Sequence, residues 1–182
     1  VEEVINYDVH RVDGVDKNTT RVRKLLESYA RNISTMAANE TIMADVRATD
    51  QTISPNTFAI YLSALRRIFI VDDVPAWSPA LRSKTKIRTS PKRHFVDPSI
   101  AVALMGTNPR GLLKDFPTFG FLFEDLCARD LRVYAQALDG EVYHYRDKNE
   151  LECDLVVALR DGRWGAVEVK LGKNEEEDAA KH

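Results

Sequence analysis

The sequence predicts a mixed α/β (α+β) protein, in which a helical, winged-helix-like part precedes a part that combines a long helix with strands. Residues 19–67 repeat apolar side chains at the spacing of amphipathic helices. Residues 117–138 have a strong helical pattern, and residues 141–171 form strand-like runs of alternating polarity. We therefore expect two domains, a helical one over residues 1–90 and an α/β one over residues 91–182.

The composition is ordinary for a soluble globular protein. Hydrophobic residues make up 44% of the 182 residues and charged residues 30%. The net charge of −2 argues against a globally basic nucleic-acid binder, although it permits a local basic patch. No apolar run approaches the length of a membrane span, and the two cysteines fit no metal motif or disulfide framework. We expect a cytoplasmic protein with reduced thiols.

Three helices and a strand are expected in the first domain. The third helix, residues 54–67, has Ser54 as a plausible N-cap and Pro55 in its first turn. The β-branched run that follows Arg67 is typical of a strand, and this order of elements suggests a winged helix-turn-helix. The helix over residues 54–67 would then either enter a DNA groove or serve only as a packed structural element. Its apolar stripe indicates a core face under both interpretations.

The most basic stretch of the chain lies at residues 80–94 and contains no acidic residue. It either follows a phosphate backbone, with DNA expected more than RNA, or forms a solvated hairpin or linker. The candidate nucleic-acid contacts are Lys84, Lys86, Arg88, Lys92 and Arg93.

One charge stands out on the helix expected over residues 117–138. Glu124 shares a stripe with small and apolar residues. A carboxylate in such surroundings is costly to bury unless it is paired or binds a cation. The alternative is that Glu124 lies at the rim of the helix and is hydrated.

Three strand-like runs follow this helix, at residues 141–146, 151–159 and 163–171. The Asp-Gly pair between the last two runs is a strong signal for a tight hairpin turn. Antiparallel pairing about that turn brings Asp154 and Glu168 to the same end of the sheet.

Four polar side chains are therefore expected to converge, namely Glu124, Asp154, Glu168 and Lys170. Carboxylates beside a lysine suit a hard divalent ion such as Mg²⁺, with Asp154, Glu168 and Glu124 as the metal ligands. Such an ion polarises a phosphate oxygen, and the lysine would orient water or stabilise developing charge. The simpler alternative is an exposed Glu168–Lys170 pair worth less than about 1 kcal/mol, with Asp154 hydrated at a strand edge.

This order of elements resembles the PD-(D/E)xK, or restriction-endonuclease-like, nuclease core. Asp154 matches the Asp of the motif, Glu168 its second acid, Lys170 its lysine, and Glu124 the helix acid of some members. Cys153 stands where the motif has Pro. Residues 121–172, "FLFEDLCARDLRVYAQALDGEVYHYRDKNELECDLVVALRDGRWGAVEVKLG", are also similar to an uncharacterised region behind bacterial and archaeal AAA-type ATPase domains.

The resemblance implies that the chain is a fragment, with an ATPase domain upstream in the same polypeptide. It implies Mg²⁺-dependent hydrolysis of nucleic acid, carried out by Asp154, Glu168, Lys170 and Glu124. The alternative is a non-catalytic module that binds nucleic acid or protein and serves the ATPase. His144, on the strand beside the proposed site, either assists a phosphate contact or is structural.

Overall fold

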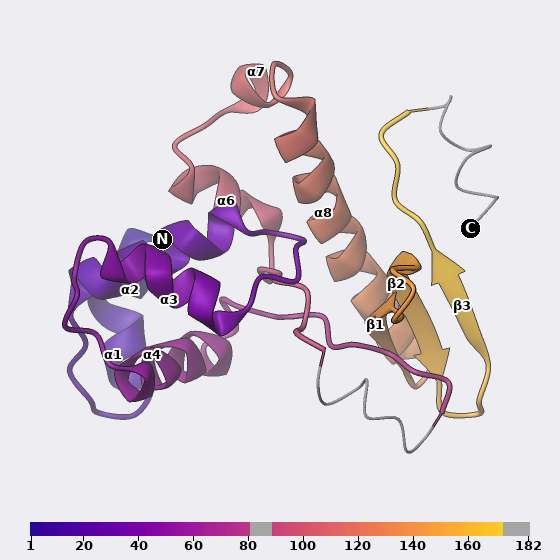
Figure 1. Ribbon diagram of the computed structural model, residues 1–182, viewed down its shortest axis with the longest axis horizontal. Helices are drawn as coiled ribbons and strands as arrows, with labels where there is room; N and C mark the ends of the chain where they lie inside the picture. Colours follow the sequence, from indigo (N-terminus) through magenta and orange to yellow (C-terminus); the bar gives the residue numbers. More distant parts are fainter. Residues whose placement is uncertain (81–88, 173–182) are drawn as a thin grey trace.

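The computed structural model describes residues 1–80 and 89–172 (Figure 1). A short π-helical segment, η1, leads into a series of α-helices, and a three-stranded sheet follows them. This confirms the mixed α+β class. The elements are η1 (Val4–Asp8), α1 (Val9–Arg11), α2 (Thr19–Arg31), α3 (Asn39–Arg47), α4 (Pro55–Arg67), α6 (Pro98–Leu104), α7 (Pro109–Leu112), α8 (Phe116–Ala137), β1 (Gly140–Arg146), β2 (Glu152–Leu159) and β3 (Trp164–Val167).

The helices of the first part begin where local chemistry favours a start. Ser54 caps α4, because its hydroxyl accepts a hydrogen bond from the Thr57 backbone N–H. Asn18 caps α2 in the same way, through the Arg21 N–H. The apolar stripe of α2 is buried as the sequence predicts and joins residues of η1, α3 and α4 in one hydrophobic core. Burial of this shared face stabilises helices that are individually short.

The strand expected after α4 is present only as isolated bridges. Val71 pairs with Phe95 and Val74 pairs with Lys92, both antiparallel, while Ala76 pairs with His144 in parallel. The spacing of three residues between Val71 and Val74 interrupts the two-residue period of a regular strand. Through the bridge to His144, this segment covers the outer edge of β1.

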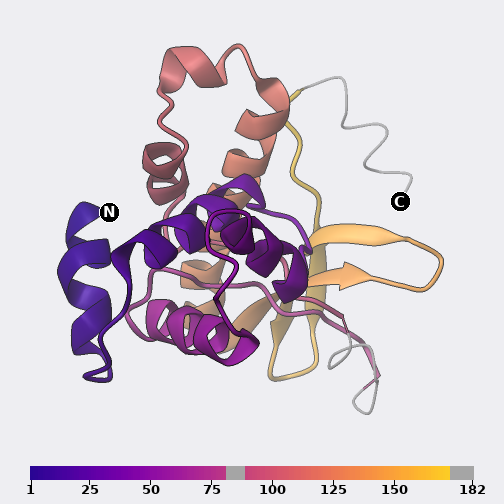
Figure 2. The same ribbon diagram turned by 60° about the vertical axis from the view of Figure 1, so that its left-hand side comes forward.

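The sheet has the order β1–β2–β3 and is antiparallel throughout. Leu155 lies opposite Val167, and the hairpin between β2 and β3 turns at Gly162, whose φ of 91° suits glycine. In Figure 2 the turn that joins β1 to β2 projects away from the helices. The strand β3 ends at Val167, four residues before the expected end, and beyond it the Val169 N–H donates to a side chain, Asp154.

The long helix α8 connects the two halves of the molecule. It lies between the N-terminal helices and the sheet (Figure 1). Leu122 near its start belongs to the first core, whereas Ala128 and Ala135 pack with Leu155 in a second core under the sheet. The helix α8 therefore presents side chains to both halves. Glu124 lies on α8 between Leu122, which belongs to the first core, and Ala128, which belongs to the second.

The first core does not stop at residue 90. Phe95, Ala101 and Leu122 belong to it, although all three lie beyond the expected domain boundary. The boundary itself stays a prediction. Within residues 1–80 and 89–172, no helix is both long enough and apolar enough to cross a bilayer.

Candidate functional site

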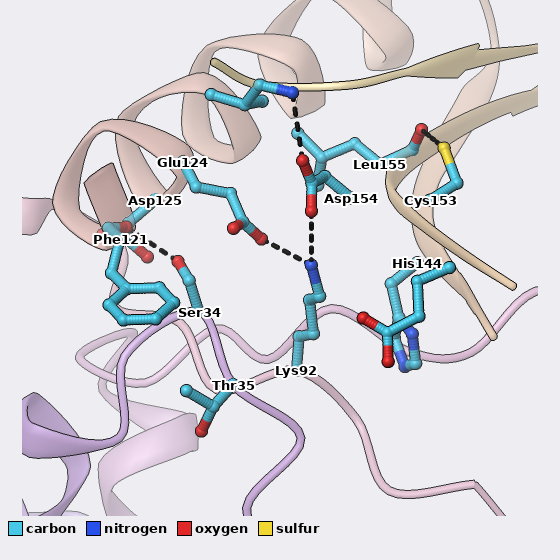
Figure 3. A network of polar contacts seen from close by, with 12 residues as sticks. Ser34, Thr35, Lys92, Phe121, Glu124, Asp125, His144, Cys153, Asp154 and Leu155 are labelled. Carbon is cyan, nitrogen blue, oxygen red and sulfur yellow. Dashed lines mark hydrogen bonds and ion pairs between the residues drawn. The ribbon is translucent and has the colours of Figure 1, made fainter. Parts of the chain in front are cut away.

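A buried lysine joins two of the predicted acids. The Lys92 Nζ lies 2.7 Å from Glu124 Oε1 and 3.1 Å from Asp154 Oδ1 (Figure 3). Glu124 comes from α8 and Asp154 from β2, so a single ammonium links the helix to the sheet. Lys92 and Glu124 are only 6% and 8% exposed. The alternative in which Glu124 is simply hydrated at a rim therefore does not describe this site.

Glu168 and Lys170 lie on the other side of Asp154. The Glu168 carboxyl group lies close enough to Asp154 for each of the two acids to shift the pKa of the other. The Lys170 Nζ lies 3.4 Å from Glu168 Oε2. Just beyond β3, the Val169 backbone N–H donates to Asp154 Oδ2 at 3.0 Å. The four residues predicted from the sequence are thus linked in series, since Lys92 joins Glu124 to Asp154, Glu168 adjoins Asp154, and Lys170 pairs with Glu168.

The three acids of this cluster have different proton affinities. Burial raises the pKa of Glu124 to about 7, and nearby Asp154 adds to the effect against the opposing pull of Lys92. Burial and Asp154 also raise the pKa of Glu168. Burial alone would raise the pKa of Asp154, but Lys92 and the Val169 N–H outweigh it and the pKa is lowered. Asp154 is consequently the acid of the three that holds its charge to the lowest pH.

The same balance keeps Lys92 charged. Burial disfavours its ammonium, but Glu124 and Asp154 more than compensate, so the pKa of Lys92 is raised. The ammonium is therefore a fixed positive charge among carboxylates.

A second buried pair holds the frame of the site. His94 Nδ1 and Asp125 Oδ1 are 2.7 Å apart, and the Phe95 N–H also donates to Asp125 Oδ1 at 3.2 Å. Asp125 follows Glu124 on α8, and His94 lies two residues after Lys92, so this pair fixes the separation between the lysine and its glutamate. Burial raises the pKa of Asp125 to about 7 and lowers the pKa of His94 to about 3.

No local sequence pattern indicates the His94–Asp125 pair, because its partners lie 31 positions apart. The expectation of a possible phosphate contact for His144 also changes. That side chain is fully buried, and its Nε2 lies 3.1 Å from the Ser90 carbonyl oxygen, which favours the structural role.

Lys92 and Arg93 differ from the sequence-based picture of exposed basic side chains. Backbone hydrogen bonds fix them, since Lys92 pairs with Val74 and the Arg93 N–H donates to the Thr35 carbonyl. Successive residues of an extended segment point in opposite directions, so Lys92 reaches the sheet while Arg93 enters the helical core. The Arg93 guanidinium contacts four groups there, the Ala37 carbonyl, the Tyr29 hydroxyl, Asp73 and the Asn39 amide oxygen.

Because Lys92 and Arg93 are buried, they are not among the exposed nucleic-acid contacts expected at residues 80–94. Lys84, Lys86 and Arg88, the other three candidates, lie outside the described residues. Any nucleic-acid contact by this stretch is therefore proposed for those three side chains alone.

An open groove of about 580 Å³ leads to the cluster. Its walls come from the α2–α3 connection, the start of α3, α8, and the adjoining ends of β1 and β2. Arg146 and Glu152 in its wall form an ion pair at 2.8 Å. Lys92, Glu124 and Asp154 line the same groove, so the site is accessible from solvent on this side.

The carboxylates of the cluster are the candidate ligands for a divalent ion. Across residues 1–80 and 89–172, no group of three or more His, Cys, Asp or Glu side chains is arranged as a metal-binding cluster. One carboxylate oxygen each from Glu124 and Asp154 nevertheless converges on the same cation, the Lys92 ammonium. The point where these two oxygens meet is therefore occupied by an ammonium, and Glu168 adjoins it through Asp154. Within the described residues no preformed site for a divalent ion is present, and a metal-binding role for these acids is a proposal.

Two family models match the chain. Residues 1–111 match a domain of unknown function, DUF8612, which covers more than half of the chain. The chain belongs to the DUF8612 family. Residues 119–182 match a second domain of unknown function, DUF4143. No curated protein and no solved structure matches the sequence.

The cluster spans both matches. Glu124, Asp154, Glu168 and Lys170 lie in the DUF4143 part, whereas Lys92 lies in the DUF8612 part. The Lys92 ion pairs are thus contacts between two separately recognised segments of one chain.

Proposed function

We propose that this chain carries a PD-(D/E)xK nuclease-like domain that hydrolyses phosphodiester bonds of nucleic acid, DNA rather than RNA, with Mg²⁺. We further propose that it is the C-terminal region of a cytoplasmic AAA-type ATPase. The observation that supports the nuclease is the convergence of Glu124, Asp154, Glu168 and Lys170 from three separate segments. Neither family description names such an activity, so the proposal depends on this convergence and on the resemblance of the motif.

Each side chain has a distinct part in the proposed reaction. Asp154 and Glu168 would hold the ion, with Glu124 as an additional ligand. A bound Mg²⁺ would polarise a phosphate oxygen and lower the pKa of a coordinated water. Lys170, whose ammonium lies beside Glu168, would orient the attacking water or stabilise charge on the phosphate. The groove beside Asp154 gives the nucleic acid a route to these groups.

The purified chain should nick supercoiled plasmid DNA when Mg²⁺ or Mn²⁺ is added, and excess EDTA should stop the reaction. Gel electrophoresis of the open-circular product measures the rate. Nicking that persists in EDTA, or its absence with both metals, would contradict the proposed function.

A second candidate function is a non-catalytic module that binds nucleic acid or protein for the ATPase. The Lys92 ion pairs favour it, because they neutralise Glu124 and Asp154 without a metal and give the cluster a structural use. The nuclease-like domain would then be a scaffold, and Lys84, Lys86 and Arg88 would contact the phosphate backbone.

Under this second candidate, DNA binding should weaken with rising salt and persist in Asp154→Ala. Replacing Lys84, Lys86 and Arg88 with Gln should reduce both the affinity and its salt dependence, as measured by fluorescence anisotropy. A matched triple variant at Lys114, Lys148 and Arg160 makes the same change in net charge. Equal losses in the two triple variants would show a non-specific effect and remove support for this candidate.

A further inference from the structure

Three aromatic side chains, those of Trp77, Tyr145 and Trp164, form a cluster against the sheet. The Trp77 and Trp164 ring centroids are 4.8 Å apart at an interplanar angle of 48°. The Trp77 and Tyr145 ring centroids are 6.1 Å apart at 65°. Trp77 lies on the segment that covers the outer edge of β1, and its N–H donates to the His144 carbonyl oxygen at 2.7 Å. The cluster therefore joins that segment to β1 and β3.

Trp164 is the exposed member of this pair of tryptophans. Trp77 is only 9% exposed, whereas Trp164 is 57% exposed although its ring packs against Trp77. Trp164 is also the first residue of β3, where pairing with Ala158 fixes its backbone. A large aromatic ring that is both exposed and held in position can stack on another flat ring at a low cost in conformational entropy.

The acids Asp154 and Glu168 lie on the same face of the sheet as Trp164. Trp164 is opposite Ala158 in the neighbouring strand. Successive residues of a strand alternate between faces, so Asp154, four positions before Ala158, and Glu168, four positions after Trp164, share this face. Four residues of a strand span about 13 Å, roughly four times the 3.4 Å rise per nucleotide of a DNA strand. A strand of a few nucleotides can therefore contact the indole and the acids together.

We propose that Trp164 is a stacking platform for an unpaired base of a nucleic-acid strand. The inference rests on the proposed function for its choice of nucleic acid as the partner, and it narrows the substrate to single-stranded or locally unpaired nucleic acid. Stacking of bases on aromatic side chains is a common way to bind single strands. In a duplex each base is already stacked between its neighbours, so an unpaired base is the one that can reach the ring.

Positive charge next to Trp164 suits the phosphates of such a strand. Arg163 precedes Trp164, and 77% of the Arg163 side chain is exposed. Its ion pair with Asp161 lies within the turn between β2 and β3, and exposed ion pairs of this kind are weak. A phosphate can therefore compete with Asp161 for the guanidinium. Trp77, which packs against Trp164, is also only three positions in sequence from the start of the basic stretch at residues 80–94.

The test measures the affinity of the whole chain for oligo(dT) of about 12 nucleotides, for an abasic strand of the same length and for a blunt duplex. EDTA is present throughout, so that no metal-dependent cleavage occurs. Trp164→Ala should weaken binding of oligo(dT) at least about fivefold and leave the affinities for the abasic strand and the duplex unchanged. Oligo(dT) should also quench the tryptophan fluorescence of the wild type, because a stacked base covers the exposed indole.

Trp164→Leu is the second variant, because it keeps an apolar side chain beside Trp77 but has no aromatic ring. It should lose affinity for oligo(dT) as Trp164→Ala does, which separates loss of the ring from loss of packing. Tyr134→Ala is the matched control, since Tyr134 is an aromatic residue of α8 that is 63% exposed and lies outside the cluster. It should bind all three ligands like the wild type.

Equal affinity of the wild type and both Trp164 variants for oligo(dT) would overturn the platform and leave the nucleic-acid function in place. An equal loss on the abasic strand would also overturn it. A dimer that Trp164→Ala dissociates in size-exclusion chromatography, without base-dependent binding, would assign this face to a second copy of the chain instead. Base-dependent binding without nicking in Mg²⁺ would support the platform and contradict the nuclease, and nicking that is independent of Trp164 would do the reverse.

Discussion

Asp154→Ala should lower the rate of Mg²⁺-dependent DNA nicking by more than about 100-fold. Asp154 is the centre of the cluster, because it contacts Lys92, accepts the Val169 N–H and lies close enough to Glu168 to shift its pKa. Its pKa is lowered, so it is the acid most fully ionised at neutral pH. Removing it takes away a proposed metal ligand and the acceptor of the Val169 N–H. The rate of plasmid nicking under saturating Mg²⁺ measures the loss.

The control for this variant is Asp16→Ala, which removes an Asp whose side chain is fully exposed and far from the cluster in sequence. It should nick DNA at the wild-type rate, and circular dichroism should confirm that both variants are folded. Equal nicking by Asp154→Ala and the wild type would show that the activity comes from a contaminant or another site.

Arg93→Met should lower the free energy of unfolding by about 3–5 kcal/mol. Arg93 is 2% exposed, and its guanidinium contacts the Ala37 carbonyl, the Tyr29 hydroxyl and Asp73. Methionine fills much of the space but leaves these acceptors without their donor. The Asp73 carboxylate also loses its ion pair with Arg93. Urea denaturation followed by circular dichroism gives the difference in unfolding free energy.

Arg31→Met is the comparison for that measurement. Arg31 also pairs with a carboxylate, that of Asp45, but its side chain is 64% exposed. Its loss should cost less than about 1 kcal/mol, as for other surface ion pairs. A similar loss in both variants would mean that burial of Arg93 does not determine its contribution.

Much of the fold could be predicted from local signals. Ser54 and Pro55 mark the start of α4, and the Asp161–Gly162 turn sets the register that brings Asp154 near Glu168. These features depend on neighbours in sequence, which a single chain displays directly. The end of β3 was harder to predict, because a side chain, Asp154, takes the Val169 N–H in place of a strand partner.

Sequence patterns indicate the acidic residues of the cluster as candidates, but they do not indicate that Lys92 pairs with them. Residue alternation and the helical stripe identified Glu124, Asp154, Glu168 and Lys170 as candidates. The basic composition of residues 80–94 predicts that Lys92 is exposed and solvated. Its partners are 32 and 62 positions away, and only the bridge to Val74 turns its side chain inward. Pairing over such distances in sequence leaves no local pattern.

The most direct test of the account is a crystal structure of the chain soaked in Mn²⁺, with anomalous scattering measured at the manganese edge. The account predicts an anomalous peak bound by the Asp154 and Glu168 carboxylates. The absence of any peak beside these carboxylates at a saturating Mn²⁺ concentration would contradict it.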